Sequence, residues 1–237
     1  ILTNVTVRVV PKPRGVATLV LAGLSDGEAA RVMAKAVGAT TAITGAAHVP
    51  AVPAAALPGS ALPSGTSLTL LRIEAASSSV APHERALAAQ LAPHTIAAQL
   101  DAPQSRLLWA HLRDVRLFAA DTRPVWRISV APMRGADVTE ALSPFGAEWF
   151  YDWAGGLVWL AMPESPDAGA RLVRAAAAKA QGHAILIRAD AKIRAEVAAF
   201  PPETAALAQL TERVKIAFDP RGVLNPGRFL SSGPGSL

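Results

Sequence analysis

The order of apolar segments in the second half of the chain is the feature that most limits its fold. Four short segments there are rich in Val, Ile, Leu and Trp, which are typical of strands: residues 125–130, 148–153, 157–162 and 183–188. Between the first two segments, apolar residues recur at the spacing of a helix. Ser165-Pro166 predicts the start of a second helix, ahead of the fourth segment. Gly155-Gly156 predicts a tight turn between the middle two. The β-α-β-β-α-β order predicts a ferredoxin-like unit.

The first half of the chain repeats this order more loosely over residues 16–91. Ser25 and Glu28 form a capping-box pattern ahead of a helix, and strand patterns lie on either side of it. Residues 49–65 carry four prolines among Ala, Gly and Ser, which predicts a loop. The fold class predicted is therefore α+β, with one antiparallel sheet or two fused ones, ferredoxin-like repeats and helices on one face.

Composition excludes several classes of protein and site. Of 237 residues, 51% are hydrophobic and none is cysteine, so a core can form but no disulfide, thiol nucleophile or cysteine-based metal site can. No uncharged apolar run is long enough for a transmembrane helix. The five histidines form no paired metal-binding motif, and we expect no metal. The net charge of +5 is compatible with nucleic-acid binding. The arginines of the chain are scattered singly, however, so we expect no nucleic-acid partner.

The two ends of the chain carry distinct patterns. Residues 1–10 alternate as a strand does, and because the chain starts within that pattern we expect it to be a fragment. Residues 203–218 have the spacing of an amphipathic helix, which Asp219-Pro220 ends. An Asn225-Pro226-Gly227-Arg228 turn follows, in which the Asn amide and the Arg guanidinium offer donors to an anionic or carbonyl-rich ligand.

The segment from Phe218 to Arg228, FDPRGVLNPGR, resembles the C-terminal segment of FAD-linked oxidases of the vanillyl-alcohol oxidase type. More specifically, WRISV at residues 126–130, WFYDWAGGLVW at 149–159 and residues 214–229 resemble the FAD-binding E subunits of glycolate oxidase. The resemblance covers most of the chain and is weakest at residues 49–120.

This resemblance implies three regions. Residues 1–13 would be the closing strand of a missing FAD-binding domain, residues 14–200 a cap (substrate) domain, and residues 201–237 a C-terminal helix and return loop. The implied function is oxidation of a 2-hydroxy acid such as glycolate. The implied partners are the missing FAD-binding domain, a catalytic flavoprotein subunit and an iron–sulfur subunit. The implied location is cytoplasmic, with any membrane association made through partner subunits.

Two departures from the family limit what this chain does by itself. It has no Gly-rich phosphate loop, so we expect it to bind FAD weakly or not at all and to be inactive alone. It also lacks the His-x-Gly-Asp-Gly-Asn-x-His motif of the catalytic subunit, which favours the accessory subunit. The alternative function is a non-catalytic ferredoxin-like module for ligand binding or dimerisation, because fold does not fix function.

Four residues are the candidates for cofactor binding: Asn225, Arg228, Arg127 and Trp126. Asn225 and Arg228 would contact the flavin domain, or would form a structural turn. Arg127 would reach a flavin or substrate carboxylate, or would be a solvated strand residue. Trp126, like the other tryptophans of this region, would stack on a flavin ring or pack in the core. Catalytic residues remain unknown.

Overall fold

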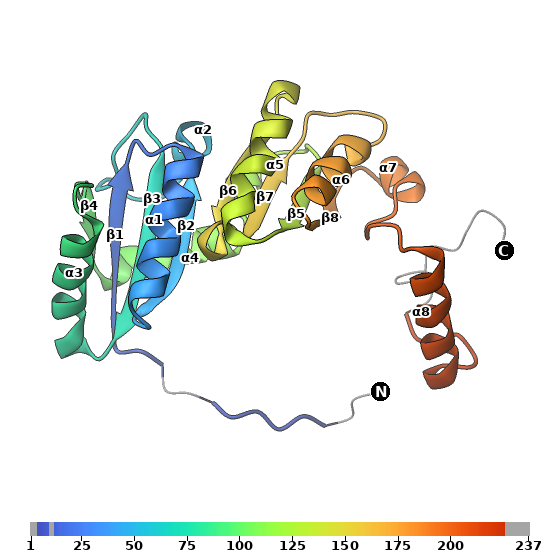
Figure 1. The fold of residues 1–237 in the computed structure, drawn as a ribbon, viewed down its shortest axis with the longest axis horizontal. Helices are drawn as coiled ribbons and strands as arrows, with labels where there is room; N and C mark the ends of the chain where they lie inside the picture. Colours follow the sequence, from blue (N-terminus) through green and yellow to red (C-terminus); the bar gives the residue numbers. More distant parts are fainter. Residues whose placement is uncertain (1–3, 10–11, 226–237) are drawn as a thin grey trace.

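A computed structural model of the protein describes residues 4–9 and 12–225. Its strands form one eight-stranded antiparallel sheet, in the order β4-β1-β3-β2-β6-β7-β5-β8 (Figure 1). The strands are β1 (Gly15–Ala22), β2 (Ile43–Val49), β3 (Leu68–Ala75), β4 (Ala98–Leu100), β5 (Val125–Ser129), β6 (Glu148–Asp152), β7 (Leu157–Ala161) and β8 (His183–Arg188).

The sheet consists of two ferredoxin-like units joined side by side. Strands β1 to β4 and strands β5 to β8 each have the order in which the fourth strand pairs with the first and the second lies at the opposite edge. The two second strands, β2 and β6, meet through one registered pair, His48 with Tyr151. The predicted fold class, with its fused antiparallel sheet, is therefore confirmed.

Helices cover one face of both units. They are α1 (Asp26–Ala39), α3 (Ser77–Leu91), α5 (Gly135–Leu142) and α6 (Ala170–Lys179). Beneath α1 and α3 the core holds Leu19, Leu21 and Leu71, whereas Trp126, Val158 and Leu160 form the core beneath α5 and α6. These residues alternate along their strands with residues of the other face, as the period of a strand requires.

The connection between the units covers the opposite face of the sheet. Because β4 lies at one edge and β5 lies near the other, the chain has to cross the sheet between them. It does so through α4 (Ala102–Arg113) and the short 3-10 helix η1 (Arg116–Phe118). A third core lies there, and it draws Leu70 from the first unit, Phe150 from the second and Trp109 and Phe118 from the connection. This core therefore bridges both units.

Several element boundaries differ from those that the sequence predicted. A capping box formed by Asp101 and Gln104 begins α4 at Ala102. The helix predicted from Ser165 begins at Ala170, because Ser165 and Asp167 bind the Gly169 amide in a turn. The predicted loop at residues 49–65 contains the short helix α2 (Ala51–Ala54).

The segments flanking the sheet make few packing contacts. Residues 4–9 belong to no strand and pair with none in the described part of the chain, so the strand predicted at residues 1–10 is not formed there. Residues 1–3 and 10 lie outside the described residues. After β8 come α7 (Ala191–Glu196) and α8 (Ala205–Phe218). Between these two helices the chain passes beside β8, where the amide of Leu186 donates to the carbonyl of Ala199 at 2.9 Å. None of the helices in the described part of the chain has the length and apolar character to cross a membrane.

The turn between β6 and β7 gives a test of this packing. Gly155 has φ of +92°, and a Cβ there would lie 2.6 Å from the Pro132 carbonyl oxygen. We expect Gly155→Ala to lower the free energy of unfolding by about 2 kcal/mol, through backbone strain and that clash. Gly38→Ala is the control, because nothing lies within 4 Å of a Cβ there. It should be neutral or stabilise by up to about 1 kcal/mol. Equal denaturation midpoints for the two variants would contradict this packing.

Candidate functional site

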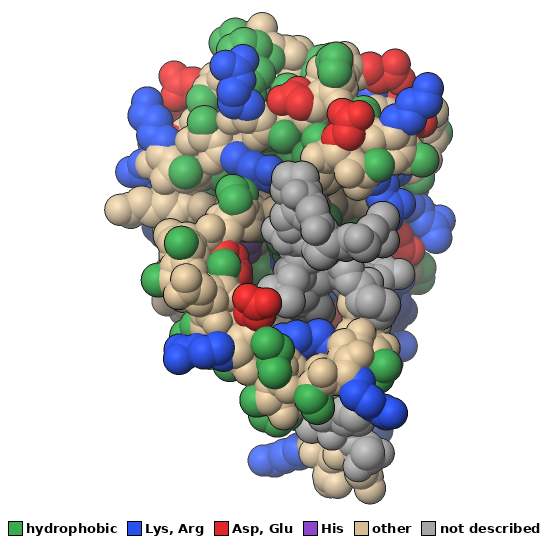
Figure 2. All heavy atoms as spheres, turned by 90° about the vertical axis from the view of Figure 1, so that its right-hand side faces the viewer, with side chains coloured by type: hydrophobic (Ala, Val, Ile, Leu, Met, Phe, Trp, Pro, Cys, Tyr) green, Lys and Arg blue, Asp and Glu red, His purple; other side chains and the backbone are tan. Residues whose placement is uncertain are grey.

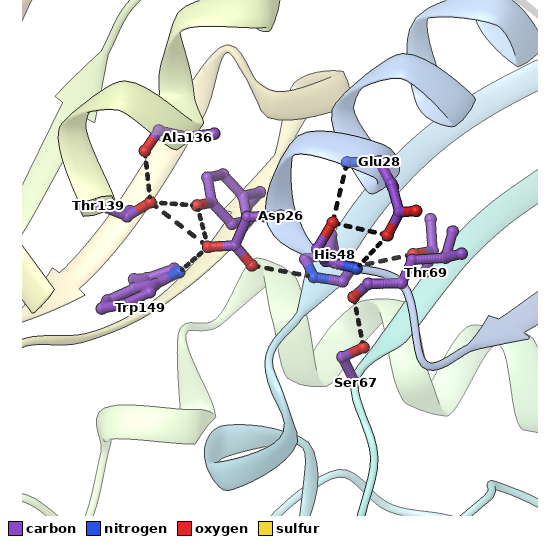
Figure 3. Close-up of polar contacts among 11 residues, drawn as sticks. Asp26, Glu28, His48, Ser67, Thr69, Ala136, Thr139 and Trp149 are labelled. Carbon is purple, nitrogen blue, oxygen red and sulfur yellow. Dashed lines mark hydrogen bonds and ion pairs between the residues drawn. The ribbon is translucent and has the colours of Figure 1, made fainter.

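A buried polar cluster lies where the two units meet. Asp26, in the first turn of α1, reaches across the junction, and its carboxylate accepts hydrogen bonds from side chains of the second unit (Figure 3). Trp149 Nε1 donates to Asp26 Oδ2 at 2.8 Å, and the hydroxyl of Tyr151 donates to the same oxygen at 2.6 Å. Thr139 of α5 lies close to both, with Oγ1 3.4 Å from Asp26 Oδ2 and in contact with the Tyr151 hydroxyl.

His48 completes the cluster from the first unit. Its ring is fully buried, with Nδ1 2.8 Å from Thr69 Oγ1. Its Nε2 lies 3.2 Å from Asp26 Oδ1, which is ion-pair distance, although the geometry is not that of an aligned hydrogen bond. One carboxylate of α1 thus contacts β2, β6 and α5 at once.

The protonation states of the cluster follow from its burial. Burial raises the pKa of Asp26, but contacts from His48, Tyr151 and Trp149 outweigh it, and the pKa lies below its ordinary value. Burial, together with the negative charge of Asp26, raises the pKa of Tyr151 above its ordinary value. Asp26 is therefore an anion at neutral pH and Tyr151 a neutral donor. The cluster thus ties α1 and β2 of the first unit to α5 and β6 of the second.

A cavity of about 670 Å³ lies at the same junction, on the side covered by α4. This volume is within the usual range for small-molecule sites, about 300–1,000 Å³. We call it the junction pocket. Its polar and aromatic lining comes from both units and from the connection: Lys12, Thr44, Arg72, Glu74, Arg106, Trp109, Arg113, Asp152 and Trp153.

The first wall of the junction pocket is built around Trp109. Its Nε1 donates to Thr18 Oγ1 at 3.0 Å, which fixes the ring on the sheet. A Cβ at Gly45 would lie 2.9 Å from that ring, so only glycine allows this approach. The Arg72 guanidinium lies 4.9 Å from the ring centroid, and its Nη2 donates to the Thr44 carbonyl at 3.0 Å. Arg72 is thus held in place beside an aromatic face.

The second wall is Trp153, in a strained turn. Trp153 and Ala154 have φ of +51° and +55°, in the left-handed region that residues other than glycine rarely adopt. Such strain persists where the surrounding structure imposes it, and it is frequent at functional sites. The turn leaves the Trp153 side chain 59% exposed, with the Arg127 guanidinium 5.1 Å from its ring centroid. The sequence predicted Trp153 as a strand residue aligned with Trp149, but β6 ends at Asp152.

Asp152 is the titratable group of this wall. One of its carboxylate oxygens accepts from the Trp153 amide at 2.8 Å. Burial raises the pKa of Asp152 above its ordinary value, and it outweighs the opposing effects of the Trp153 amide and the charge of Arg72. A carboxyl group with a raised pKa in a pocket is a candidate functional group. In the described residues, no group of three or more His, Asp and Glu side chains could hold a metal ion.

Three of the four residues predicted to bind the cofactor lie in the described part of the chain, and two of them, Trp126 and Arg127, lie on opposite faces of β5. Trp126 is fully buried in the core and donates from Nε1 to the Ala168 carbonyl at 2.9 Å, which matches the core-packing alternative and leaves no open ring face. Arg127 lies on the other face, over Trp153. Asn225 is exposed, with φ of +47°. Arg228 lies outside the described residues. The roles of these residues remain predictions.

Sequence reasoning missed the residues of the junction pocket. Arg72, Arg106 and Trp109 fall in the region where the family resemblance is weakest, and Asp152 looks like an ordinary strand residue. Asp26 was part of the capping-box pattern, but its partners Trp149 and Tyr151 are more than 120 residues away. The available signal was Asp101, whose capping box would have marked α4 as a full helix with Arg106 and Trp109 on it.

Comparisons with known proteins give a likeness of fold. No family model matches the sequence, and no curated protein matches it. Among solved structures, the chain is similar to 4-ethylphenol oxidase from Gulosibacter chungangensis, determined as an isoeugenol complex, with a TM-score of 0.56 and 15% sequence identity. The match covers 92% of this chain and 54% of the oxidase, so the chain spans about half the length of that protein. At this identity the match shows a shared fold.

The Asp26 cluster can be tested by removing its acceptor. We expect Asp26→Ala to lower the free energy of unfolding by about 3 kcal/mol, because Trp149 and His48 lose their partner. The lowered pKa also predicts that this contribution is present above about pH 4 and lost as pH falls through the folded-state pKa, so wild type and variant should converge in acid. Chemical denaturation across pH measures both effects.

Asp137→Ala is the matched control. Asp137 is an exposed carboxylate that pairs with Arg134 at 2.9 Å, and its loss should cost less than about 1 kcal/mol. Equal losses in the two variants at pH 7 would show that the junction does not depend on Asp26.

Proposed function

We propose that this chain is the cap-domain portion of an FAD-linked oxidoreductase subunit that takes part in oxidising a 2-hydroxy acid such as glycolate. The observation that carries the proposal is the fold match to an oxidase over 92% of this chain, since that match spans about half of the oxidase and leaves the other half for a further domain. The FDPRGVLNPGR segment, with its resemblance to FAD-linked oxidases, supports the same conclusion.

The flanking segments offer apolar surface for that further domain. On α8, Leu207, Leu210 and Val214 are each about half exposed, and Phe218 is 75% exposed. In the N-terminal segment the valines at positions 5, 7 and 9 are also exposed. Figure 2 views the molecule from the side on which α8 lies, and hydrophobic side chains are visible there among cationic ones. We propose that both segments pack on an FAD-binding domain, because exposed apolar surface of this kind marks an interaction site.

The described residues do not themselves fit an FAD. Trp126 is enclosed by the core, and the sequence offers no Gly-rich loop for the pyrophosphate. When bound to the complete subunit, the flavin would accept the electrons of the substrate. This chain would contribute the junction pocket, whose cations can neutralise and orient a substrate carboxylate. Partner subunits with a second flavin and an iron–sulfur group belong to the same proposal.

The test uses the complete coding sequence, including the reading frame upstream of Ile1. We expect the purified product to retain FAD and to reduce an artificial electron acceptor in the presence of glycolate, with its partner subunits co-expressed. Asn225→Ala and Arg228→Ala should each lower the retained flavin by at least about fivefold, because a hydrogen bond to a charged group contributes about 1.5–3 kcal/mol. Absorbance of the bound flavin measures this effect.

Arg85→Ala is the control, since Arg85 is an exposed residue of α3. Unchanged flavin content in both C-terminal variants would exclude them as flavin-domain contacts. A product that contains no flavin at all would leave the alternative, a ligand-binding or dimerisation module without catalytic activity.

A further inference from the structure

The junction pocket has an excess of positive charge. Four cationic side chains line it, Lys12, Arg72, Arg106 and Arg113, against the two carboxylates of Glu74 and Asp152. Arg72 is engaged by Thr44 and lies 3.7 Å from Glu74, and Arg113 pairs with Asp114 at 2.8 Å. In residues 4–9 and 12–225, Arg106 has no ion-pair partner. The pocket therefore has a cation available for an anionic ligand.

The pocket also has one exposed, flat apolar surface. Trp153 lines it with a ring that is 59% exposed, and Arg127 lies over that ring, whereas Trp109 is a buried part of the lining that is covered by Arg72. Gly45 leaves room for the Trp109 ring, because a Cβ there would clash with it. The left-handed backbone at Trp153 is strained, and it places the Trp153 ring. Aromatic faces of this kind bind planar apolar groups. The volume of about 670 Å³ also exceeds what a two-carbon acid would fill.

We propose that the junction pocket binds an organic carboxylate that carries a flat apolar group, with Arg106 and Arg72 receiving the carboxylate and the exposed Trp153 ring contacting the apolar part. If this ligand is the substrate, the proposal rests on the proposed function and deepens it, because an aromatic 2-hydroxy acid is then favoured over glycolate. As a binding site, it requires only residues of this chain.

Asp152 makes binding to this site depend on pH. The charged groups that line the pocket with it are Arg72 and Glu74 from β3, Arg106 and Arg113 from α4, and Lys12 ahead of β1. An ionised Asp152 repels a bound carboxylate, whereas a protonated one does not. Since burial raises its pKa, affinity for the ligand should rise as pH falls toward the range where Asp152 protonates.

The test is titration of the 237-residue chain with mandelate, an aromatic 2-hydroxy acid, followed by tryptophan fluorescence and calorimetry. Mandelate should bind at least about tenfold more tightly than its neutral amide and more tightly than glycolate or inorganic phosphate. Binding of the amide or of phosphate as tight as that of mandelate would overturn the carboxylate assignment. Binding of glycolate as tight as that of mandelate would overturn the apolar part.

Variants locate the site. Arg106→Ala should weaken mandelate binding about fivefold to tenfold, and it should not disturb folding because Arg106 is exposed. Arg72→Lys tests the second cation while keeping its charge, and Arg85→Ala on α3 is the control that should bind as wild type does. Asp152→Asn, in which an amide oxygen can still accept from the Trp153 amide, should bind mandelate more tightly and remove the pH dependence. Wild-type affinity in Arg106→Ala and Arg72→Lys together would overturn the proposal.

Failure of this inference is distinguishable from failure of the proposed function. Mandelate binding that depends on Arg106, combined with a complete subunit that retains no flavin, would support the site and reject the oxidoreductase. A flavin-containing subunit that oxidises glycolate, combined with no mandelate binding to this chain, would reject the site and keep the oxidoreductase.

Discussion

The Asp26 carboxylate is the polar group that joins the two units on the helix-covered face, opposite the core that bridges them beneath α4. Each ferredoxin-like unit has its own core, but β2 and β6 share only the pair of His48 and Tyr151, which is a short length of ladder for an eight-stranded sheet. Asp26 adds contacts that a ladder does not provide, because it is on α1 of one unit and accepts from Trp149 and Tyr151 of the other. A partly buried anion with several donors favours this orientation, since another arrangement would give up those hydrogen bonds.

The position of the junction pocket follows from how the units are connected. A chain that leaves the first unit at one edge has to cross the sheet before it begins the second, and α4 is the part that crosses. Its inner side contributes Trp109 to the bridging core, while Arg106 and Arg113 border the pocket. The Asp26 cluster and α4 therefore hold the same junction from opposite faces, and the pocket lies between surfaces that neither unit possesses by itself.

The sequence predicted the elements better than the site because the two depend on different information. Strand alternation and the Ser25 capping box are local, so the α+β class and the fused antiparallel sheet could be recognised from them. The pocket depends on contacts between distant segments, such as that of Gly45 with Trp109. The left-handed Trp153 could not be inferred at all, since its neighbours read as a continuous strand. Trp126 is the opposite case. Its sequence motif made it a candidate for cofactor binding, but the residue is fully buried in the core.

The symmetry of the strand order also determines which surfaces can receive another protein. With the second strands joined at the centre, the last strand of each unit forms an outer edge. The β4 edge is only three residues long, and on β8 the Leu186 amide is already taken by the Ala199 carbonyl. Short or occupied edges resist the addition of a foreign strand, and so protect against edge-to-edge aggregation. A foreign strand would thus find only three residues of β4 to pair with, and no free amide at Leu186 of β8.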